Sequence, residues 1–187
     1  MNDVPVRTII DETQVKRALT RISYEVLEKD DDASRLAVVG IRTGGEFLGR
    51  RLQAQLGEIS GVEIPFGVLD ITLYRDDLSH SAEQPTLKGT ELPFPISGKR
   101  IVLVDDVLFT GRTVRAALDA IIDFGRPSRV ELAVLADRGH RELPIRPDYV
   151  GKNLPTSLDE FVTVTLEELG ETDGVHIGTL ISVDEKN

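Results

Sequence analysis

Two adjacent acids, Asp105 and Asp106, follow an apolar run that begins at residue 100 and is typical of a buried strand. A turn with small and hydroxyl side chains, residues 110–113, comes soon after them and leads into a helical pattern. Carboxylates at a strand end can hold ribose hydroxyls and a Mg²⁺ shell, and backbone N–H groups at a helix start can hold a phosphate. A glycine at 111 would let the backbone approach that phosphate closely. The combination predicts a site for a phosphorylated sugar.

A second loop suited to an anion lies earlier in the chain, between a short apolar strand and a helix. Its backbone N–H groups could bind a pyrophosphate, and Arg42 could neutralise it. Taken alone, this loop could equally be a plain strand-to-helix turn, and the acid pair taken alone would more often cap a helix. Two such loops in one chain favour a ligand with two anionic groups.

Strands and helices alternate along the chain, which predicts an α/β fold with a mainly parallel, twisted sheet flanked by helices. Asp11, with Gln14 three residues later, forms a capping-box pattern before a helix whose apolar residues recur to Val26. Further helices are expected at residues 45–56 and 114–124. Strands are expected at residues 35–41, 100–104, 129–136, 161–166 and 175–183, with one or two within 62–74. Both anion loops then fall at the carboxyl ends of strands, where ligands of such sheets collect.

Two stretches lack regular periodicity. Residues 75–98 are polar and rich in Asp, Ser, Pro and Gly, and a loop of this length is usually a lid or disordered. Arg75, at its root, could close over a pyrophosphate and exclude water. Residues 139–155 contain three prolines and are expected to be irregular, and the segment around His140 could supply polar groups for a nucleobase. With no repeat or linker, residues 1–187 are expected to form a single domain.

Composition limits the classes of protein to which the chain can belong. The absence of Cys excludes disulfides and thiolate metal sites. No apolar run approaches the roughly 18 residues of a membrane span, and no signal peptide is recognisable, so a cytoplasmic location is expected. The net charge of −10 argues against general nucleic-acid binding, although residues 138–152 are locally basic. No Ser/His/Asp triad, zinc-spaced cluster or dinucleotide-binding glycine motif is present.

Residues 102–113 resemble the phosphoribosyl pyrophosphate (PRPP) signature of the type I phosphoribosyltransferases. Longer stretches resemble the PyrR family of pyrimidine operon attenuation regulators, which are also uracil phosphoribosyltransferases. The matching stretches are residues 17–22, 70–78, 134–146 and 151–157, within a resemblance that extends from about residue 11 to 183. It implies the type I phosphoribosyltransferase fold, with a flexible loop at about 75–98 and a small base-binding hood contributed by about 137–187.

The resemblance further implies a reaction in which uracil and PRPP give UMP and pyrophosphate, with Mg²⁺ as cofactor. Asp105, Asp106 and Arg75 would be catalytic, and the two aspartates would hold Mg²⁺ through PRPP and water. The residues implied to bind PRPP or UMP are Arg42, Thr43, Gly44, Val107, Leu108, Phe109, Thr110, Gly111, Arg112, Thr113, Arg138 and Val162.

The same resemblance implies a homodimer or higher homo-oligomer that binds leader RNA of the pyrimidine operon when UMP is present. The residues implied to contact RNA are Thr20, Arg21, His140, Arg141, Arg146, Lys152 and Thr156. The chain departs from the family at Gly44, where many relatives have Arg, and at Tyr24, where several have His. Two alternatives stay open: an RNA-binding nucleotide sensor with vestigial activity, and a phosphoribosyltransferase for another base.

Overall fold

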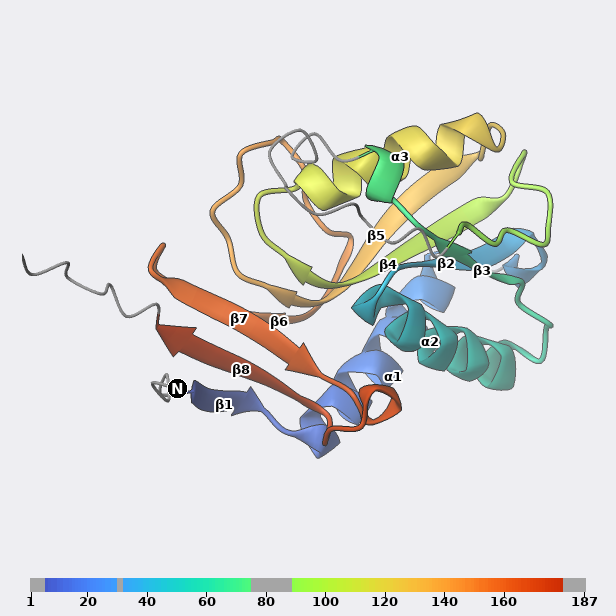
Figure 1. The fold of residues 1–187 in the computed structure, drawn as a ribbon. Helices are drawn as coiled ribbons and strands as arrows, with labels where there is room; N and C mark the ends of the chain where they lie inside the picture. Colours follow the sequence, from blue (N-terminus) through green and yellow to red (C-terminus); the bar gives the residue numbers. More distant parts are fainter. Residues whose placement is uncertain (1–5, 30–31, 75–88, 180–187) are drawn as a thin grey trace, which may run out of the picture.

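A five-stranded parallel sheet forms the body of the protein (Figure 1). The computed structural model describes residues 6–29, 32–74 and 89–179. The strands run in the order β3-β2-β4-β5-β6, and every neighbouring pair is parallel. Their bounds are β2 (Leu36–Ile41), β3 (Phe66–Leu69), β4 (Arg100–Leu108), β5 (Arg129–Asp137) and β6 (Tyr149–Asn153).

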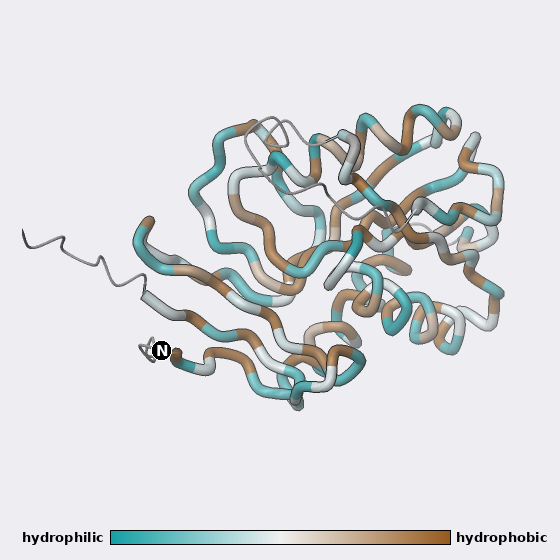
Figure 2. The backbone as a smooth tube through the Cα atoms, viewed as in Figure 1, coloured by the Kyte–Doolittle hydropathy of each residue, from teal (hydrophilic) through white to brown (hydrophobic). Residues whose placement is uncertain are grey.

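Three helices cover the two faces of this sheet. Helices α1 (Glu12–Glu28) and α2 (Gly44–Ser60) pack on one face, and α3 (Arg112–Asp123) packs on the other (Figure 1). The chain is hydrophobic along the central strands and along the helix sides that meet them (Figure 2). The predicted capping box at Asp11 is confirmed, because its side chain accepts from the Gln14 N–H and the Gln14 side chain accepts from the Asp11 N–H. In the described part of the chain, no helix has the length and hydrophobicity of a membrane span.

A small antiparallel sheet forms a hood beyond the carboxyl ends of the parallel strands (Figure 1). It contains β1 (Val6–Ile10), β8 (Gly174–Thr179) and β7 (Glu160–Thr165), in that order. Arg51 of α2 joins the hood to the body through ion pairs with Glu168 and with the buried Asp173. The hood therefore draws β1 from the start of the chain, which the sequence did not predict.

The structure changes several predicted boundaries. Strand β4 continues through Leu108 instead of ending at 104, and residues 72–74 form a 3-10 turn instead of a strand. The stretch 139–155, expected to be irregular, contains β6, whose Tyr149 is buried and donates its hydroxyl to Glu131. Of the predicted flexible loop 75–98, residues 89–98 are held against the body, because Glu91 and Val68 exchange two backbone hydrogen bonds of 2.8 Å. The remainder of that loop lies outside the described residues.

Candidate active site

The acid pair lies at the carboxyl end of the central strand of the sheet. Because β4 continues through both residues, Asp105 and Asp106 point to opposite faces. Asp105 is buried, at 6% exposure, and its carboxylate accepts from the Asp106 N–H at 3.0 Å. Burial, and then repulsion from Asp106, raise the pKa of Asp105 well above its ordinary value. Asp106 is half-buried and accepts from the Val107 N–H at 2.7 Å.

Glycines bring the first anion loop against this acid pair. A Cβ at Gly44 would lie 2.2 Å from Oδ2 of Asp106, and one at Gly45 would lie 2.3 Å from the Val104 carbonyl. In this chain the lack of side chains at 44 and 45 lets the first turn of α2 sit this close to the end of β4. Thr43 precedes that turn and is exposed. The two loops predicted from sequence are therefore neighbours in space.

Arg42 is already engaged with two carboxylates. Its Nε lies 3.3 Å from Oε2 of Glu46, and its Nη2 lies 3.1 Å from Oε1 of Glu91. The Arg42 side chain is only 16% exposed. Its role in neutralising a pyrophosphate stays a prediction, and an anion at this loop would compete with Glu46 and Glu91 for the guanidinium.

The second anion loop, residues 108–113, is called the phosphate loop below. It turns from β4 into α3, and Gly111 at the helix start has φ 94°, a conformation that other residues adopt only with strain. The Thr110 hydroxyl accepts from the Arg112 N–H at 3.3 Å. The N–H groups of the first helical turn point away from the helix, as a phosphate requires.

The loop after β5 packs on the phosphate loop. Residues 138–146, called the basic loop below, begin with Arg138, which is 7% exposed and has its guanidinium 4.0 Å from the Phe109 ring centre. Arg138 Nη2 donates to the carbonyls of Ser157 and Glu160, where the hood begins. Burial lowers the pKa of Arg138. Val162 lies half-buried on β7 of the same hood.

The residues predicted to contact RNA lie on α1, on the basic loop and on β6 with the segment after it. Arg21 Nη2 donates to the carbonyls of Val150 and Gly151 at 2.9 and 2.8 Å, which joins α1 to β6. Thr20 is exposed on the same helix, Arg146 is exposed on the basic loop, and Lys152 is exposed on β6, the edge strand. A groove of about 680 Å³ runs between the basic loop and β6, and Arg146 is among its lining residues.

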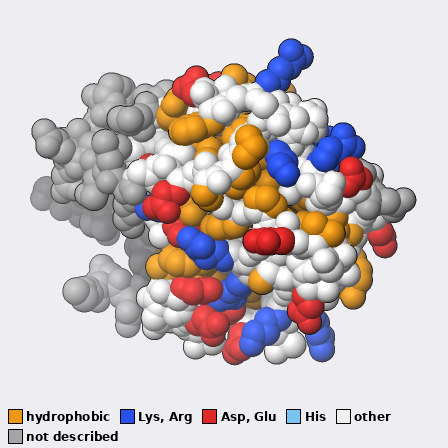
Figure 3. All heavy atoms as spheres, turned by 90° about the vertical axis from the view of Figure 1, so that its right-hand side faces the viewer, with side chains coloured by type: hydrophobic (Ala, Val, Ile, Leu, Met, Phe, Trp, Pro, Cys, Tyr) orange, Lys and Arg blue, Asp and Glu red, His pale blue; other side chains and the backbone are white. Residues whose placement is uncertain are grey.

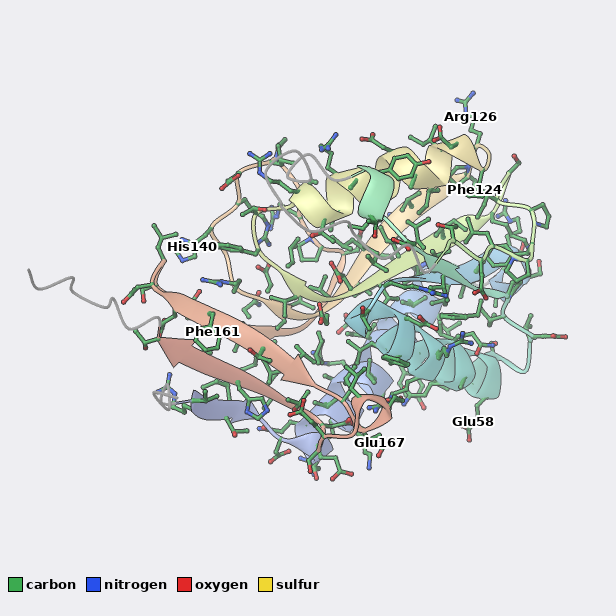
Figure 4. The ribbon with its side chains drawn as sticks, viewed as in Figure 1. Glu58, Phe124, Arg126, His140, Phe161 and Glu167 are labelled. Atoms are coloured by element: carbon green, nitrogen blue, oxygen red, sulfur yellow. The ribbon has the colours of Figure 1, made fainter. Side chains whose placement is uncertain are left out.

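His140 and Thr156 hold the basic loop together. The His140 ring N–H donates to the Thr156 carbonyl, and the Thr156 hydroxyl donates to the Arg138 carbonyl. His140 and Phe161 lie at the hood end of the molecule, whereas Glu58 and Arg126 lie at the opposite end (Figure 4). The face at that opposite end mixes acidic, basic and hydrophobic side chains without a patch of one sign (Figure 3).

Two acidic residues, Asp137 and Glu142, lie in the segment predicted to serve a nucleobase, but neither was assigned a role from the sequence. Asp137 forms an ion pair of 2.6 Å with Arg141, and Glu142 forms one of 2.6 Å with Arg112 of the phosphate loop. The four-residue spacing of Asp137 and Arg141 was a visible signal, but such a pair is usually read as a solvated surface pair. The catalytic assignment of Arg75 lies outside the described residues.

A parallel sheet with an acid pair, two anion loops at its carboxyl edge and a hood above them defines a phosphoribosyltransferase domain. The family model for the phosphoribosyl transferase domain matches residues 6–168. The hypoxanthine phosphoribosyltransferase of Trypanosoma cruzi superposes with a TM-score of 0.73 at 16% identity, over 95% of this chain and 93% of that one. This likeness shows the fold.

Closer relatives narrow the family. A "Bifunctional protein PyrR" of Deinococcus radiodurans is 57% identical over 92% of this chain and 94% of its own length. One from Listeria welshimeri is 56% identical over 88% of this chain and 92% of its own. The chain belongs to the bifunctional PyrR proteins of the phosphoribosyltransferase family.

Proposed function

We propose that the protein is a uracil phosphoribosyltransferase that also regulates pyrimidine biosynthetic genes by binding leader RNA in response to UMP. The single observation that carries the enzymatic part is the position of the first anion loop against the acid pair, from which β4 leads directly into the phosphate loop. One loop offers backbone donors for a 5′-phosphate, and the other offers them for a pyrophosphate. A ligand that has both groups on one ribose is PRPP, and membership of the bifunctional PyrR proteins supports uracil as its partner.

In the proposed reaction the bond from C1 of the ribose to pyrophosphate breaks, and a ring nitrogen of uracil bonds to C1 and releases its proton to solvent. The sugar becomes cationic between these events, so fixed negative charge beside it stabilises the transition state. Asp105 and Asp106 supply that charge and hold the ribose hydroxyls. Burying the charged carboxylate of Asp105 is unfavourable, and this cost raises the pKa of Asp105 in the free protein. A cationic sugar beside the carboxylate would offset that cost.

Mg²⁺ fits this donor set in one particular way. Within the described residues, no three His, Cys, Asp or Glu side chains gather to hold a metal by themselves. The two carboxylates can complete the coordination of an ion held mainly by PRPP oxygens and water, the usual manner of binding Mg²⁺. The bound ion would neutralise the pyrophosphate leaving group. Asp106, half-buried beside Gly44, is the better placed of the two to face it.

The base would lie between the basic loop and the hood. Arg138 and the backbone at Val162 are proposed to contact the uracil ring, and the buried Nε of Arg138 has no hydrogen-bond partner among the described residues. A buried donor without a partner favours a ligand that supplies an acceptor, such as a ring carbonyl. A phosphoribosyltransferase for another base is the runner-up, because a carbonyl alone does not distinguish uracil from a purine.

The regulatory part of the proposal depends on the basic groups around the groove beside β6. Arg146 lines the groove, Lys152 is exposed on β6 and Arg21 is exposed on α1. Such groups can bind RNA phosphates on an otherwise acidic protein. A homodimer or higher homo-oligomer would double this surface, and a cytoplasmic location would give access to the transcript. An RNA-binding sensor with vestigial activity is the alternative.

Two assays test these parts separately. Protein given uracil, PRPP and Mg²⁺ should form UMP, and the double variant Asp105→Asn/Asp106→Asn should lose roughly 100-fold or more of the turnover with its fold intact. Full turnover in the double variant would refute the role of the acid pair. A gel shift with a transcript of the pyrimidine leader should strengthen on addition of UMP, and no shift at moderate salt with UMP would refute the regulatory role.

A further inference from the structure

Three consecutive carbonyls of the phosphate loop accept hydrogen bonds from the basic loop. The Leu108 carbonyl accepts from the Arg138 N–H at 3.1 Å, and the Phe109 carbonyl accepts from Arg141 Nη1 at 2.9 Å. The Thr110 carbonyl accepts from the N–H groups of residues 142 and 143 at 2.9 and 3.2 Å. The carbonyl side of the phosphate loop is therefore used by the basic loop, while its amide side is the one suited to a phosphate.

Arg141 provides the only side-chain donor in this series, and its guanidinium is nearly fully used. Its Nε donates to the Ile145 carbonyl at 3.0 Å, and Nη1 donates to the carbonyls of Phe109 and Gly139 at 2.9 and 3.1 Å. Its Nη2 donates to Oδ2 of Asp137 at 2.6 Å. Four of the five N–H donors of an arginine are thus occupied, and the side chain is 20% exposed.

An arginine that binds RNA directly needs free N–H donors, and Arg141 has few left. An RNA phosphate is usually gripped by two parallel N–H groups of an arginine, and Arg141 has at most one to offer without breaking an internal bond. Arg146, by contrast, is exposed and lines the groove, and Lys152 is exposed on β6. Arg141 instead joins the phosphate loop, at Phe109, to Ile145, the residue before Arg146.

We propose that Arg141 is a positioning residue that couples the phosphate site to the RNA face, acting on RNA through the basic loop and not by direct contact. This inference rests on the proposed function. The physical link is the peptide unit: the N–H of Thr110 and the carbonyl of Phe109 belong to one peptide group. A phosphate that accepts from that N–H polarises the carbonyl and strengthens its bond to Arg141. Bound UMP would therefore stiffen the basic loop, and RNA would bind more tightly to the more ordered surface.

The test compares Asp137→Asn with Arg146→Gln in RNA binding, using a transcript of the leader that precedes the pyrimidine biosynthetic genes. The measured quantity is the ratio of the RNA Kd without UMP to the RNA Kd with UMP. Wild-type protein should show a ratio of about 10, within the usual range of coupling between sites. Asp137→Asn keeps Arg141 and removes the carboxylate that holds it, so the ratio should fall to about 3 or less.

Salt dependence separates coupling from direct contact. Arg146→Gln should keep the ratio and lower the slope of log K against log salt by about 0.7–0.9, the loss of one phosphate contact. Arg141→Lys should lower the ratio and leave the UMP-free slope unchanged. If Arg141 contacted RNA directly, Asp137→Asn would free its guanidinium and lower the RNA Kd. That result would overturn the role of Arg141 but leave the proposed regulatory function standing. Wild-type protein without UMP dependence would overturn the inference together with the regulatory function.

Discussion

Replacing Gly44 by alanine should misplace Asp106 and slow catalysis without unfolding the protein. The added Cβ would lie 2.2 Å from Oδ2, 2.7 Å from Cγ and 2.9 Å from Cβ of Asp106, whereas ordinary contact begins at 3.4 Å. The carboxylate oxygen must retreat by 3.4 − 2.2, or 1.2 Å. A shift of about 1 Å in a positioned group costs about 100-fold in rate, which is about 2.7 kcal/mol of transition-state stabilisation.

The assay is steady-state UMP formation with uracil and PRPP, together with thermal unfolding. We expect kcat to fall about 100-fold in Gly44→Ala, and Tm to fall modestly, because the Asp106 Cβ, 2.9 Å from the added Cβ, can retreat only with its backbone. Gly57→Ala is the matched control in the same helix. A Cβ at Gly57 would meet only the Val62 carbonyl, at 3.4 Å, so this variant should keep full activity. A Gly44→Ala enzyme with wild-type kcat would refute the reasoning.

Three further predictions address the phosphate loop, the acid pair and the hood. Gly111→Ala should cost about 1–2 kcal/mol, because φ is 94° there, and should raise KM for PRPP; unfolding and kinetics check this. Asp105→Asn should be more stable than wild type at pH 8, since the raised pKa marks a buried charge that opposes folding, and urea unfolding should show the gain vanish below about pH 3.9. Arg51→Met should destabilise by about 3 kcal/mol at pH 7, because Asp173 is left buried and unpaired. Asp173 has a lowered pKa in the fold, so that loss should shrink in urea unfolding as the pH falls through the range where its carboxylate protonates.

The parts of the site that depend on local pattern were predictable from sequence. An apolar run followed by two acids indicates β4, although the strand continues past both acids to Leu108, and a glycine between hydroxyls marks the start of α3. The alternation of strands and helices then implies that parallel strands share one carboxyl edge. Because both segments follow strands of that sheet, residues 42–44 are expected beside residues 105–113 from the sequence alone.

The parts that depend on long-range pairing were not predictable. Arg42 pairs with Glu91, which lies 49 residues away, and nothing in the sequence around either residue indicates the other. Strand β6 is short, at the sheet edge and close to prolines, so its alternation is too weak to detect. The basic run from residue 138 was read as one surface, although Arg141 is turned inward by Asp137 and by three carbonyls. Charge alone does not say which cations face solvent.

The most direct test of the account is product identity under competition. The protein would be given PRPP, Mg²⁺ and equal concentrations of uracil and hypoxanthine. The nucleotides formed would be separated, identified and quantified by mass spectrometry. We expect UMP as the main product, with its rate lowered roughly 100-fold or more in Asp105→Asn/Asp106→Asn. Formation of inosine monophosphate in preference to UMP, or of UMP at an equal rate in the double variant, would contradict the account.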